Sequence, residues 1–363
     1  MRQATPINER DRVLLVTEAT YPFHWGGLST WCHALIRELP EVDFSLIAIC
    51  GTPLAQAQFE FPPNLVDFRP HPLWGVQNAW ELNRGVTARD ARRGARRTTE
   101  AAVAEGFEAS FTTFLAQILG DSRDDGRLAS SIHAMYRFLL EHDFDRTFRS
   151  RTVWEALGRE TNARFPNLAA LHRSGDSRVS LAEIRTALQW IYHWFFSLSQ
   201  RLPEVEVAHA TMAGVCSMVA AVAKLEHGAG LVLSEHGIYL RECYLAEHGS
   251  SNSLFGKLVK LGFARRMTEV AYSFADVIAP CCDYNHRWER RIGAEQERIR
   301  TAYYGIDSDL YSPAERPRNE TPIVVWAGRI DPLKDVETLL RAAAIVHAVR
   351  PEIRFRLYGA AAP

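Results

Sequence analysis

The sequence of 363 residues predicts an α/β fold, in which a Rossmann-like parallel-sheet domain with a large helical insertion precedes the first β-α-β unit of a second such domain. Three observations predict it. Strand and helix patterns alternate early in the chain, long helical patterns replace them at about 78–200, and the alternation then resumes. The expected parts are an N-terminal domain at 11–304, a linker at 305–320 and the start of a second domain at 321–363.

The first elements are a strand, a helix and a second strand. Residues 13–17 (VLLVT) and 44–50 (FSLIAIC) are continuous apolar runs typical of buried strands. Between them, Trp31, Leu35 and Leu39 recur at helical spacing. A strand–helix–strand segment of this length favours a parallel pair with a right-handed crossover.

The insertion is clearest at 180–199, where apolar residues fall on one helical stripe. Ser180 and Glu183 have the spacing of a capping box at its start. Asp143 and Asp145 form a D-x-D pattern, which can hold a metal–nucleotide complex when it ends a strand. Because the pattern lies here in a helical stretch, we expect a solvated turn instead.

After the insertion, strand and helix patterns alternate again. Strands are expected at 205–210, 231–234, 276–280 and 299–304, and helices at 214–227 (closed by Gly228), in the stretch up to about 274 and from Asp283. Residues 321–363 add a strand, a helix and a strand. A piece of this size rarely buries enough surface to be stable alone and leaves sheet edges unpaired. It is therefore expected to be the beginning of a domain that is cut short.

Composition argues against several classes of protein. The net charge is −1, so neither nucleic acid nor an anionic membrane surface is an expected partner. No apolar run is long enough to span a bilayer, and the polar N-terminus has no signal-peptide pattern. The 6 scattered cysteines form no C-x-x-C pair, which indicates reduced residues in a cytoplasmic protein and no metal site. The basic run between Arg84 and Arg97 fits a solvated helix face better than contact with a partner or an acidic polymer.

Candidate chemistry collects at the strand ends, because ligands of open parallel sheets bind outside the carboxyl ends of the strands. Gly26 and Gly27 follow the first strand, where they would let a phosphate approach a helix N-terminus. On its own the pair fits equally well a tight turn before a helix capped by Ser29. The motif is not G-x-G-x-x-G and no acidic residue is placed for a ribose, which disfavours a nicotinamide-binding domain.

The densest polar cluster is the stretch SEHGIYLRE, which follows a strand. His236 lies at the strand end, and this position favours a functional histidine over a structural one. Glu235, Tyr239, Arg241 and Glu242 surround it and are candidate substrate-binding residues.

Two other strand ends carry weaker signals. His209 is a candidate substrate contact, although a hydrogen-bonded structural histidine fits it better. Arg329 and Lys334 lie on the loop before a helix that begins near Asp335, and a guanidinium and an ammonium at such a place suit a diphosphate. Taken alone, this pair would be an ordinary solvated loop.

Together these motifs resemble a known family. VLLVTEATYPFHWGGLSTW, LSEHGIYLRE, DVIAPCCDYNHRW, YYGID and WAGRIDPLKDVETLLRA occur in the order found in family 4 glycosyltransferases of the GT-B fold. The chain most resembles the Pel-type exopolysaccharide glycosyltransferases, which have an extended N-terminal region with a helical insertion. The resemblance covers nearly the whole chain except parts of residues 78–200.

The resemblance implies roles for individual residues. Gly26 and Gly27 would lie against the donor diphosphate, with Gly27 and His236 at the reacting centre. Arg329 and Lys334 would neutralise the leaving diphosphate. Many members have an asparagine where this chain has the second tyrosine of YYGID, so that turn is assigned no catalytic role.

The implied reaction transfers a sugar, with retention, from a nucleotide-sugar donor, expected to be a UDP-sugar, to a growing exopolysaccharide or other glycan. Residues 11–304 would form the acceptor-side domain and 321–363 the start of the nucleotide-sugar-binding domain, without a cofactor or a metal. The protein would be cytoplasmic, peripheral to the inner face of the membrane through partners in a polysaccharide synthase complex.

One departure from the family gives an alternative. The family's E-x-x-x-x-x-x-x-E pair, further along the second domain, has no counterpart here, so the resemblance implies a truncated second domain and an incomplete donor site. The alternative is a non-catalytic scaffold or binding subunit of a polysaccharide synthase complex, with the helical insertion as its docking surface.

Overall fold

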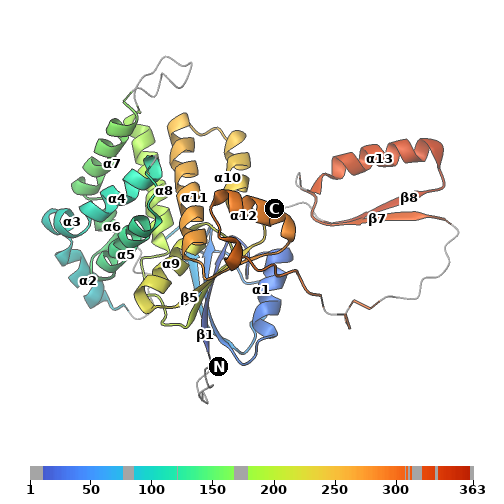
Figure 1. Ribbon diagram of the computed structural model, residues 1–363, viewed down its shortest axis with the longest axis horizontal. Coiled ribbons are helices and arrows are strands. Elements are labelled where there is room, and N and C mark those ends of the chain that lie inside the picture. The colour runs from blue at the N-terminus through green and yellow to red at the C-terminus, as the bar shows by residue number, and fades with distance from the viewer. Residues whose placement is uncertain are drawn as a thin grey trace. The chain divides into compact units, whose positions relative to one another are not determined.

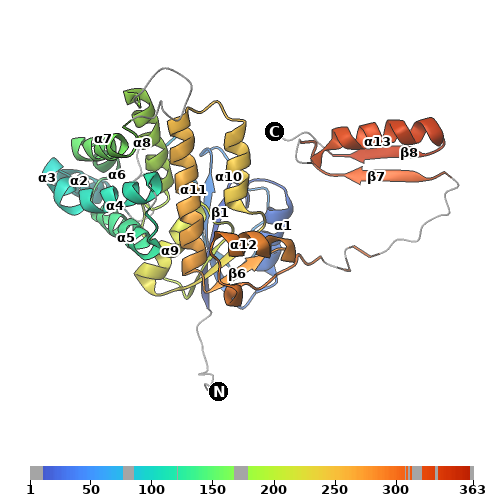
Figure 2. The same cartoon turned by 45° about the horizontal axis from the view of Figure 1, so that its top comes forward.

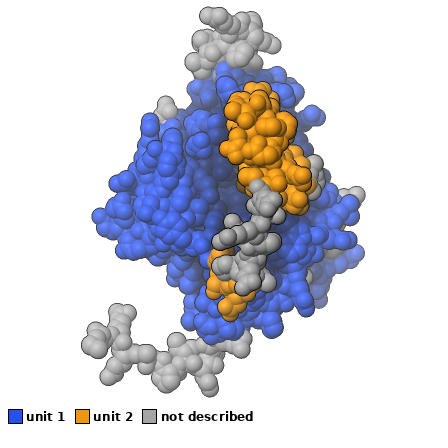
Figure 3. All heavy atoms as spheres, turned by 90° about the vertical axis from the view of Figure 1, so that its right-hand side faces the viewer, with its two compact units in different colours: residues 1–305 blue, residues 306–363 orange. Residues whose placement is uncertain are grey.

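The computed structural model describes eight stretches of the chain, to which all statements below refer: residues 11–76, 86–120, 122–166, 179–306, 308–309, 311–312, 321–331 and 334–359. The chain divides into two compact units, Met1–Gly305 and Ile306–Pro363 (Figure 3). Most of the expected linker lies outside the described residues, as do Arg84 and parts of the expected insertion. The functional roles of the two expected domains, at 11–304 and 321–363, stay predictions.

Unit 1 is built on a parallel sheet of 6 strands in the order β3-β2-β1-β4-β5-β6 (Figure 1). The order changes direction between β1 and β4, so the carboxyl ends of these two strands form the topological switch point where ligands of such sheets bind. The strands are β1 (Arg12–Glu18), β2 (Asp43–Cys50), β3 (Leu65–Pro72), β4 (Val207–Ala210), β5 (Gly230–Glu235) and β6 (Val277–Pro280).

The central strand β1 is buried on both faces, which explains its continuous apolar sequence. Leu14 and Val16 belong to the larger core cluster, while Leu15 belongs to a second cluster with Ile36 and Leu46. Successive side chains of a strand point to opposite faces. The sheet therefore separates two cores, as expected for an α/β layer structure.

Helices cover both faces of the sheet. Helix α1 (Gly27–Arg37) packs in the smaller core with β1 and β2, and α9 (Val215–His227) in the larger one. The remaining helices that follow strands of the sheet are α10 (Tyr239–His248), α11 (Leu254–Phe274) and α12 (His286–Ile292).

The helical insertion is confirmed in its described parts. Figures 1 and 2 show its helices gathered beside α9 and α11, on the side away from α1. Ser180 and Glu183 form the expected capping box at the start of the last of them. The helices are α2 (Ala88–Arg97), α3 (Glu100–Gly106), α4 (Glu108–Leu119), α5 (Asp125–Glu141), α6 (Phe144–Phe148), α7 (Arg151–Arg164) and α8 (Leu181–Phe196).

Two strand assignments from the sequence were wrong. The edge strand β3 was missed, because its sequence LVDFRPHP contains two prolines, which only an edge strand tolerates. The expected strand at 299–304 is not one. Only Ile299 forms a bridge, to Ile278, and the segment continues beside β6 through a hydrogen bond from the N–H of Ala302 to the carbonyl of Pro280 (2.9 Å).

Unit 2 contains β7 (Ile323–Ala327), α13 (Val336–Val349) and β8 (Arg354–Tyr358), with the two strands parallel. The expected β-α-β unit is therefore confirmed. None of its described residues is buried, and apolar side chains such as Val325 and Ile345 are 60% and 70% exposed. In its described part, this unit has no buried core of its own.

Among the residues that the structure describes, no helix combines the length and the hydropathy that crossing a bilayer requires.

Candidate functional site

Side chains from three elements meet at the carboxyl ends of β4 and β5. His209 is the penultimate residue of β4, Ser234 lies near the end of β5 and His236 follows it, while Trp31 reaches them from α1. Nε2 of His209 is 2.8 Å from Oγ of Ser234. The ring of Trp31 makes edge contacts with both histidines, at centroid distances of 5.7 Å and 4.6 Å.

His209 is enclosed between neighbouring strands. Its side chain is buried, and burial, followed by the nearby charge of His236, lowers its pKa to about 4. The ring is therefore neutral at ordinary pH and is held by Ser234. This environment agrees with the structural interpretation of His209.

His236 is also neutral, because burial lowers its pKa to about 4. Nδ1 of its ring lies 2.6 Å from the hydroxyl oxygen of Tyr304. Nε2 is buried and has no hydrogen-bond partner among the described residues. A buried polar atom without a partner is unusual and calls for an explanation, such as a catalytic role or a bound water molecule.

The glycine pair lies at an open helix end. Helix α1 begins at Gly27, with Gly26 as the preceding N-cap residue, so the interpretation in which Ser29 caps the helix was wrong. Ser29 is buried inside the helix and does not cap it, and within the described part of the chain no side chain bonds to the N-terminal amides. The φ of Gly26 is 172°, which any residue adopts, and a Cβ on either glycine would meet nothing within 4 Å. Neither backbone strain nor packing within the described structure therefore demands these glycines.

The other residues of the SEHGIYLRE stretch differ in exposure. Glu235 is fully buried, its Oε1 accepts the N–H of Tyr239 (3.1 Å), and the hydroxyl of Tyr272 donates to its Oε2. Burial raises the pKa of Glu235 to about 8. Arg241 is exposed. The carboxyl group of Glu235 thus forms hydrogen bonds within the fold, whereas Arg241 is open to solvent.

Tyr239 and Glu242 lie at the beginning of α10. Burial raises the pKa of Tyr239 well above its usual value, and the charge of Glu18 adds to this. Burial also raises the pKa of Glu242. A Cβ on Gly237 would lie 2.1 Å from Oε1 of Glu242, so the glycine of the E-H-G motif makes room for this carboxyl group.

Sequence reasoning missed three residues at this edge of the sheet. Trp31 was interpreted only as part of a helical stripe, and Tyr304 only as a variant turn. Glu18 ends β1 and its Oε2 accepts the N–H of Cys216 (3.4 Å) at the start of α9. Burial raises the pKa of Glu18. The signal that was available for Glu18 was its position at the end of a strand.

Arg329 and Lys334 both lie on the loop between β7 and α13 in unit 2. Nε of Arg329 is 3.2 Å from Oδ2 of Asp331, and the arginine side chain is 56% exposed. The backbone N–H of Lys334 donates to Oδ1 of the same aspartate (3.1 Å), and Lys334 is exposed. Asp335 caps α13 through the N–H of Thr338. One aspartate thus organises the loop that carries both cations.

The D-x-D pattern is structural. Asp143 caps α6 by accepting the N–H of Arg146 (2.8 Å), and Asp145 accepts the hydroxyl of Tyr192 (2.6 Å). The expectation of a solvated turn was wrong for Asp145, which is buried. Across the described stretches, no group of three or more histidine, cysteine, aspartate or glutamate residues is arranged to hold a metal ion.

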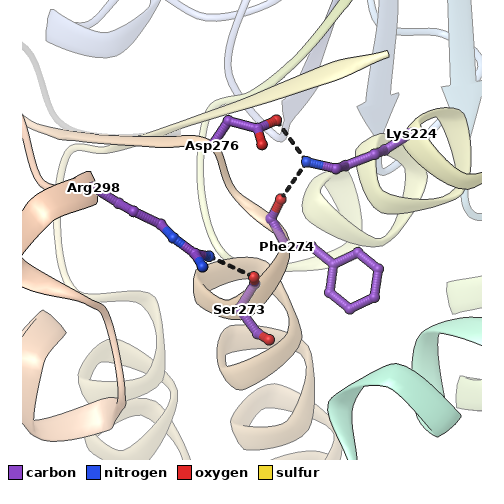
Figure 4. Close-up of a pocket in the computed structure, with 5 residues that line it drawn as sticks. All are labelled: Lys224, Ser273, Phe274, Asp276 and Arg298. Atoms are coloured by element: carbon purple, nitrogen blue, oxygen red, sulfur yellow. Dashed lines mark hydrogen bonds and ion pairs between the residues drawn. The ribbon is translucent and has the colours of Figure 1, made fainter. Parts of the chain in front are cut away.

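A separate pocket lies at the amino end of the sheet, where α11 ends before β6 (Figure 4). Lys224 donates to the carbonyl of Phe274 (3.0 Å) and to Asp276 (2.6 Å), and Arg298 donates to the carbonyl of Ser273 (2.7 Å). Cations at a helix C-terminus satisfy its last carbonyls and complement its dipole. These residues therefore fix the end of α11.

Comparison with known proteins gives glycosyltransferases as relatives over short segments. The D-inositol 3-phosphate glycosyltransferase of Thermobispora bispora is 39% identical over 72 residues, which are 18% of this chain and 17% of that protein. The enzyme of the same name from Streptomyces scabiei is 30% identical over 99 residues, 25% of this chain and 22% of that protein. The chain thus matches about a fifth of the length of these relatives.

Solved structures with a similar arrangement include Anabaena HepE in complex with UDP and glucose, at a TM-score of 0.43 and 11% identity, over 96% of this chain and 61% of that one. The lipopolysaccharide outer core galactosyltransferase WaaB is similar at a TM-score of 0.37 and 9% identity, over 96% of this chain and 68% of that one.

One protein family matches most of unit 1. It is described as "Domain of unknown function (DUF3492)", and the match runs over residues 11–297. Since this range is well over half of the chain, the protein belongs to the DUF3492 family.

Proposed function

We propose that the protein is a family 4, Pel-type glycosyltransferase of the GT-B fold, or the N-terminal portion of one. It transfers a sugar from a nucleotide-sugar, a UDP-sugar, to a growing exopolysaccharide or other glycan, with retention. The short matches to enzymes named as glycosyltransferases support this reading. The sequence motifs, which occur in the family's order, support it independently.

The observation that carries the proposal is the state of His236. It is neutral, it lies beside the topological switch point, and its Nε2 is buried without a partner among the described residues. A neutral imidazole suits the hydroxyl groups of a sugar, which both donate and accept hydrogen bonds. A few convergent polar groups at a strand edge are typical of small-molecule sites.

The glycine pair and the unit 2 loop suit the donor diphosphate. Among the described residues, no side chain caps or obstructs the N-terminus of α1, so its amides suit an anion. Arg329 and Lys334 supply two cations. As the bond to the sugar breaks, negative charge develops on the diphosphate, and these groups would stabilise it.

The proposed mechanism draws its charge stabilisation from side chains and backbone amides and calls on no metal or cofactor. The sugar develops positive charge in the transition state, and exclusion of water from the reacting centre would protect it. The proposal places the protein in the cytoplasm, held at the inner face of the membrane by partners in a polysaccharide synthase complex.

A thermal-shift titration of the full chain with UDP-glucose and with UDP tests the proposal. Ligand that binds only the folded protein raises its Tm with concentration. Arg329→Ala and Lys334→Ala are each expected to weaken binding about tenfold or more, since each removes a charge-assisted hydrogen bond to the diphosphate.

Arg341→Ala is the matched control for this test. Arg341 is an exposed arginine on α13 of the same unit, paired with Glu337. Its replacement should leave the titration unchanged. If neither UDP nor any UDP-sugar shifts the Tm of the unaltered chain, donor binding by this chain is refuted.

A further inference from the structure

Tyr304 lies directly against His236 at the carboxyl edge of the sheet. Its hydroxyl oxygen is 2.6 Å from Nδ1, and the two rings are nearly parallel, with 3° between their planes and 5.5 Å between their centroids. The two residues are 68 positions apart in the sequence. A hydrogen bond from Ala302 to Pro280 ties the segment before Tyr304 to β6, so the sheet itself fixes the tyrosine beside the histidine.

This hydrogen bond determines which nitrogen of His236 carries the proton. Burial lowers the pKa of His236 to about 4 and raises the pKa of Tyr304, so near neutral pH the imidazole is uncharged and the phenol keeps its hydrogen. The thiol of Cys281 also lies beside the Tyr304 hydroxyl, and an imidazole nitrogen is a stronger acceptor than sulfur. The Tyr304 hydroxyl therefore donates to Nδ1, and the single ring proton of His236 lies on Nε2.

The Nε2–H group of His236 is the ring group that the hydrogen bond with Tyr304 leaves available to a ligand. It is buried near the ring of Trp31 and has no partner among the described residues. Leaving a buried donor unpaired is unfavourable, so an oxygen atom that reaches it gains a hydrogen bond at little cost. The position beside the switch point is where a ligand of this fold class is expected.

We propose that Tyr304 is a positioning residue, which holds His236 as its Nε2–H tautomer so that this N–H donates a hydrogen bond to an oxygen of the donor's sugar. The inference rests on the proposed function for the identity of the ligand. The sequence resemblance assigned no catalytic role to the YYGID turn, whereas this inference gives its second tyrosine, Tyr304, a positioning role. The tautomer itself does not depend on any ligand.

Tyr304→Phe tests the inference, because it removes the hydroxyl and keeps the ring. In the full chain labelled with ¹⁵N-histidine, NMR is expected to show unaltered His236 as the Nε2–H tautomer with a hydrogen-bonded Nδ1. In the variant, the Nδ1 resonance should move to the value of an unbonded nitrogen, and the Nδ1–H form should become populated. UDP-glucose should then bind about tenfold more weakly, the usual cost of one hydrogen bond.

Tyr303→Phe is the matched control, since this neighbouring tyrosine is 65% exposed and makes no contact with His236 in the described structure. It should change neither the His236 resonances nor the affinity. An Nδ1–H tautomer in the unaltered chain, or an unchanged Nδ1 resonance in Tyr304→Phe, would overturn the inference. If the Nε2–H tautomer is found but UDP-glucose does not bind, the proposed function and the ligand part of this inference fail together, whereas the tautomer assignment stands.

Discussion

Replacing Gly262 by alanine is expected to destabilise unit 1 by about 3 kcal/mol, since overpacking of this kind costs that much when the backbone must move. Gly262 lies on α11 where this helix meets α4. A Cβ there would lie 2.0 Å from the carbonyl oxygen of Ile118 and 3.2 Å from its carbonyl carbon. Both atoms belong to the backbone, so no side-chain rotation relieves the clash. Urea unfolding followed by circular dichroism measures the loss.

Gly158→Ala is the control for this prediction. Gly158 lies inside α7, and a Cβ there would meet nothing within 4 Å. Because alanine favours a helix interior over glycine, this change should raise the free energy of unfolding by about 0.5–1 kcal/mol. The same chemical change should therefore have opposite signs at two helical sites. Equal stability of Gly262→Ala and the unaltered chain would show that α4 and α11 approach less closely than described.

The contact at Gly262 matters because it joins the insertion to the sheet domain. One turn later on α11, Arg266 is 3% exposed and donates to Gln117 of α4 and to Asp125 of α5 (2.8 Å). A close backbone approach and a buried arginine thus lie side by side at the same junction. The insertion is held to α11 by specific packing as well as by apolar area.

Local patterns were enough to predict much of the fold. The capping box of Ser180 and the glycine end of α9 at Gly228, where φ is 72°, depend on neighbouring residues only and were predicted from the sequence. The missed edge strand and the failed strand at 299–304 depend on which other strand lies alongside. That information is not local, so periodicity alone could not supply it.

For the site, the strand-end rule placed His209 and His236 at one edge of the sheet, and in the structure both rings contact Trp31. Residues that alternate along a strand point to opposite faces, so Ser234 bonds to His209 while Glu235 turns inward to Tyr272. The partner of His236 lies in a segment 68 residues later, which no pattern near the histidine indicates. For Gly26 and Gly27, the sequence fitted a tight turn and a phosphate-binding helix end equally well. Only the backbone conformation in the structure identified an open helix end.

Buried carboxyl groups make the free energy of unfolding of unit 1 depend on pH. Glu289 of α12 is fully buried, and neither of its side-chain oxygens has a hydrogen-bond partner among the described residues. Burial raises its pKa to about 7, from 4.5 in an unfolded chain. The charge of Glu289 in turn helps to raise the pKa of Glu235. The folded state therefore binds these protons more tightly than the unfolded state does.

Glu289 is accordingly expected to reduce the stability of unit 1 as the pH rises. Between pH 4.5 and about 7 the folded chain holds a proton on Glu289 that the unfolded chain has released, so the free energy of unfolding falls with pH by linkage. From pH 5 to pH 8 this group alone should lower the free energy of unfolding by roughly 2–3 kcal/mol.

Glu289→Gln keeps the shape of the side chain and cannot ionise, so it should remove that part of the slope. Glu297→Gln, at an exposed carboxyl group, should keep the full slope. Urea unfolding at pH 5, 6, 7 and 8 measures all three chains, and an unchanged slope in Glu289→Gln would mean that this carboxyl group is already ionised in the folded protein.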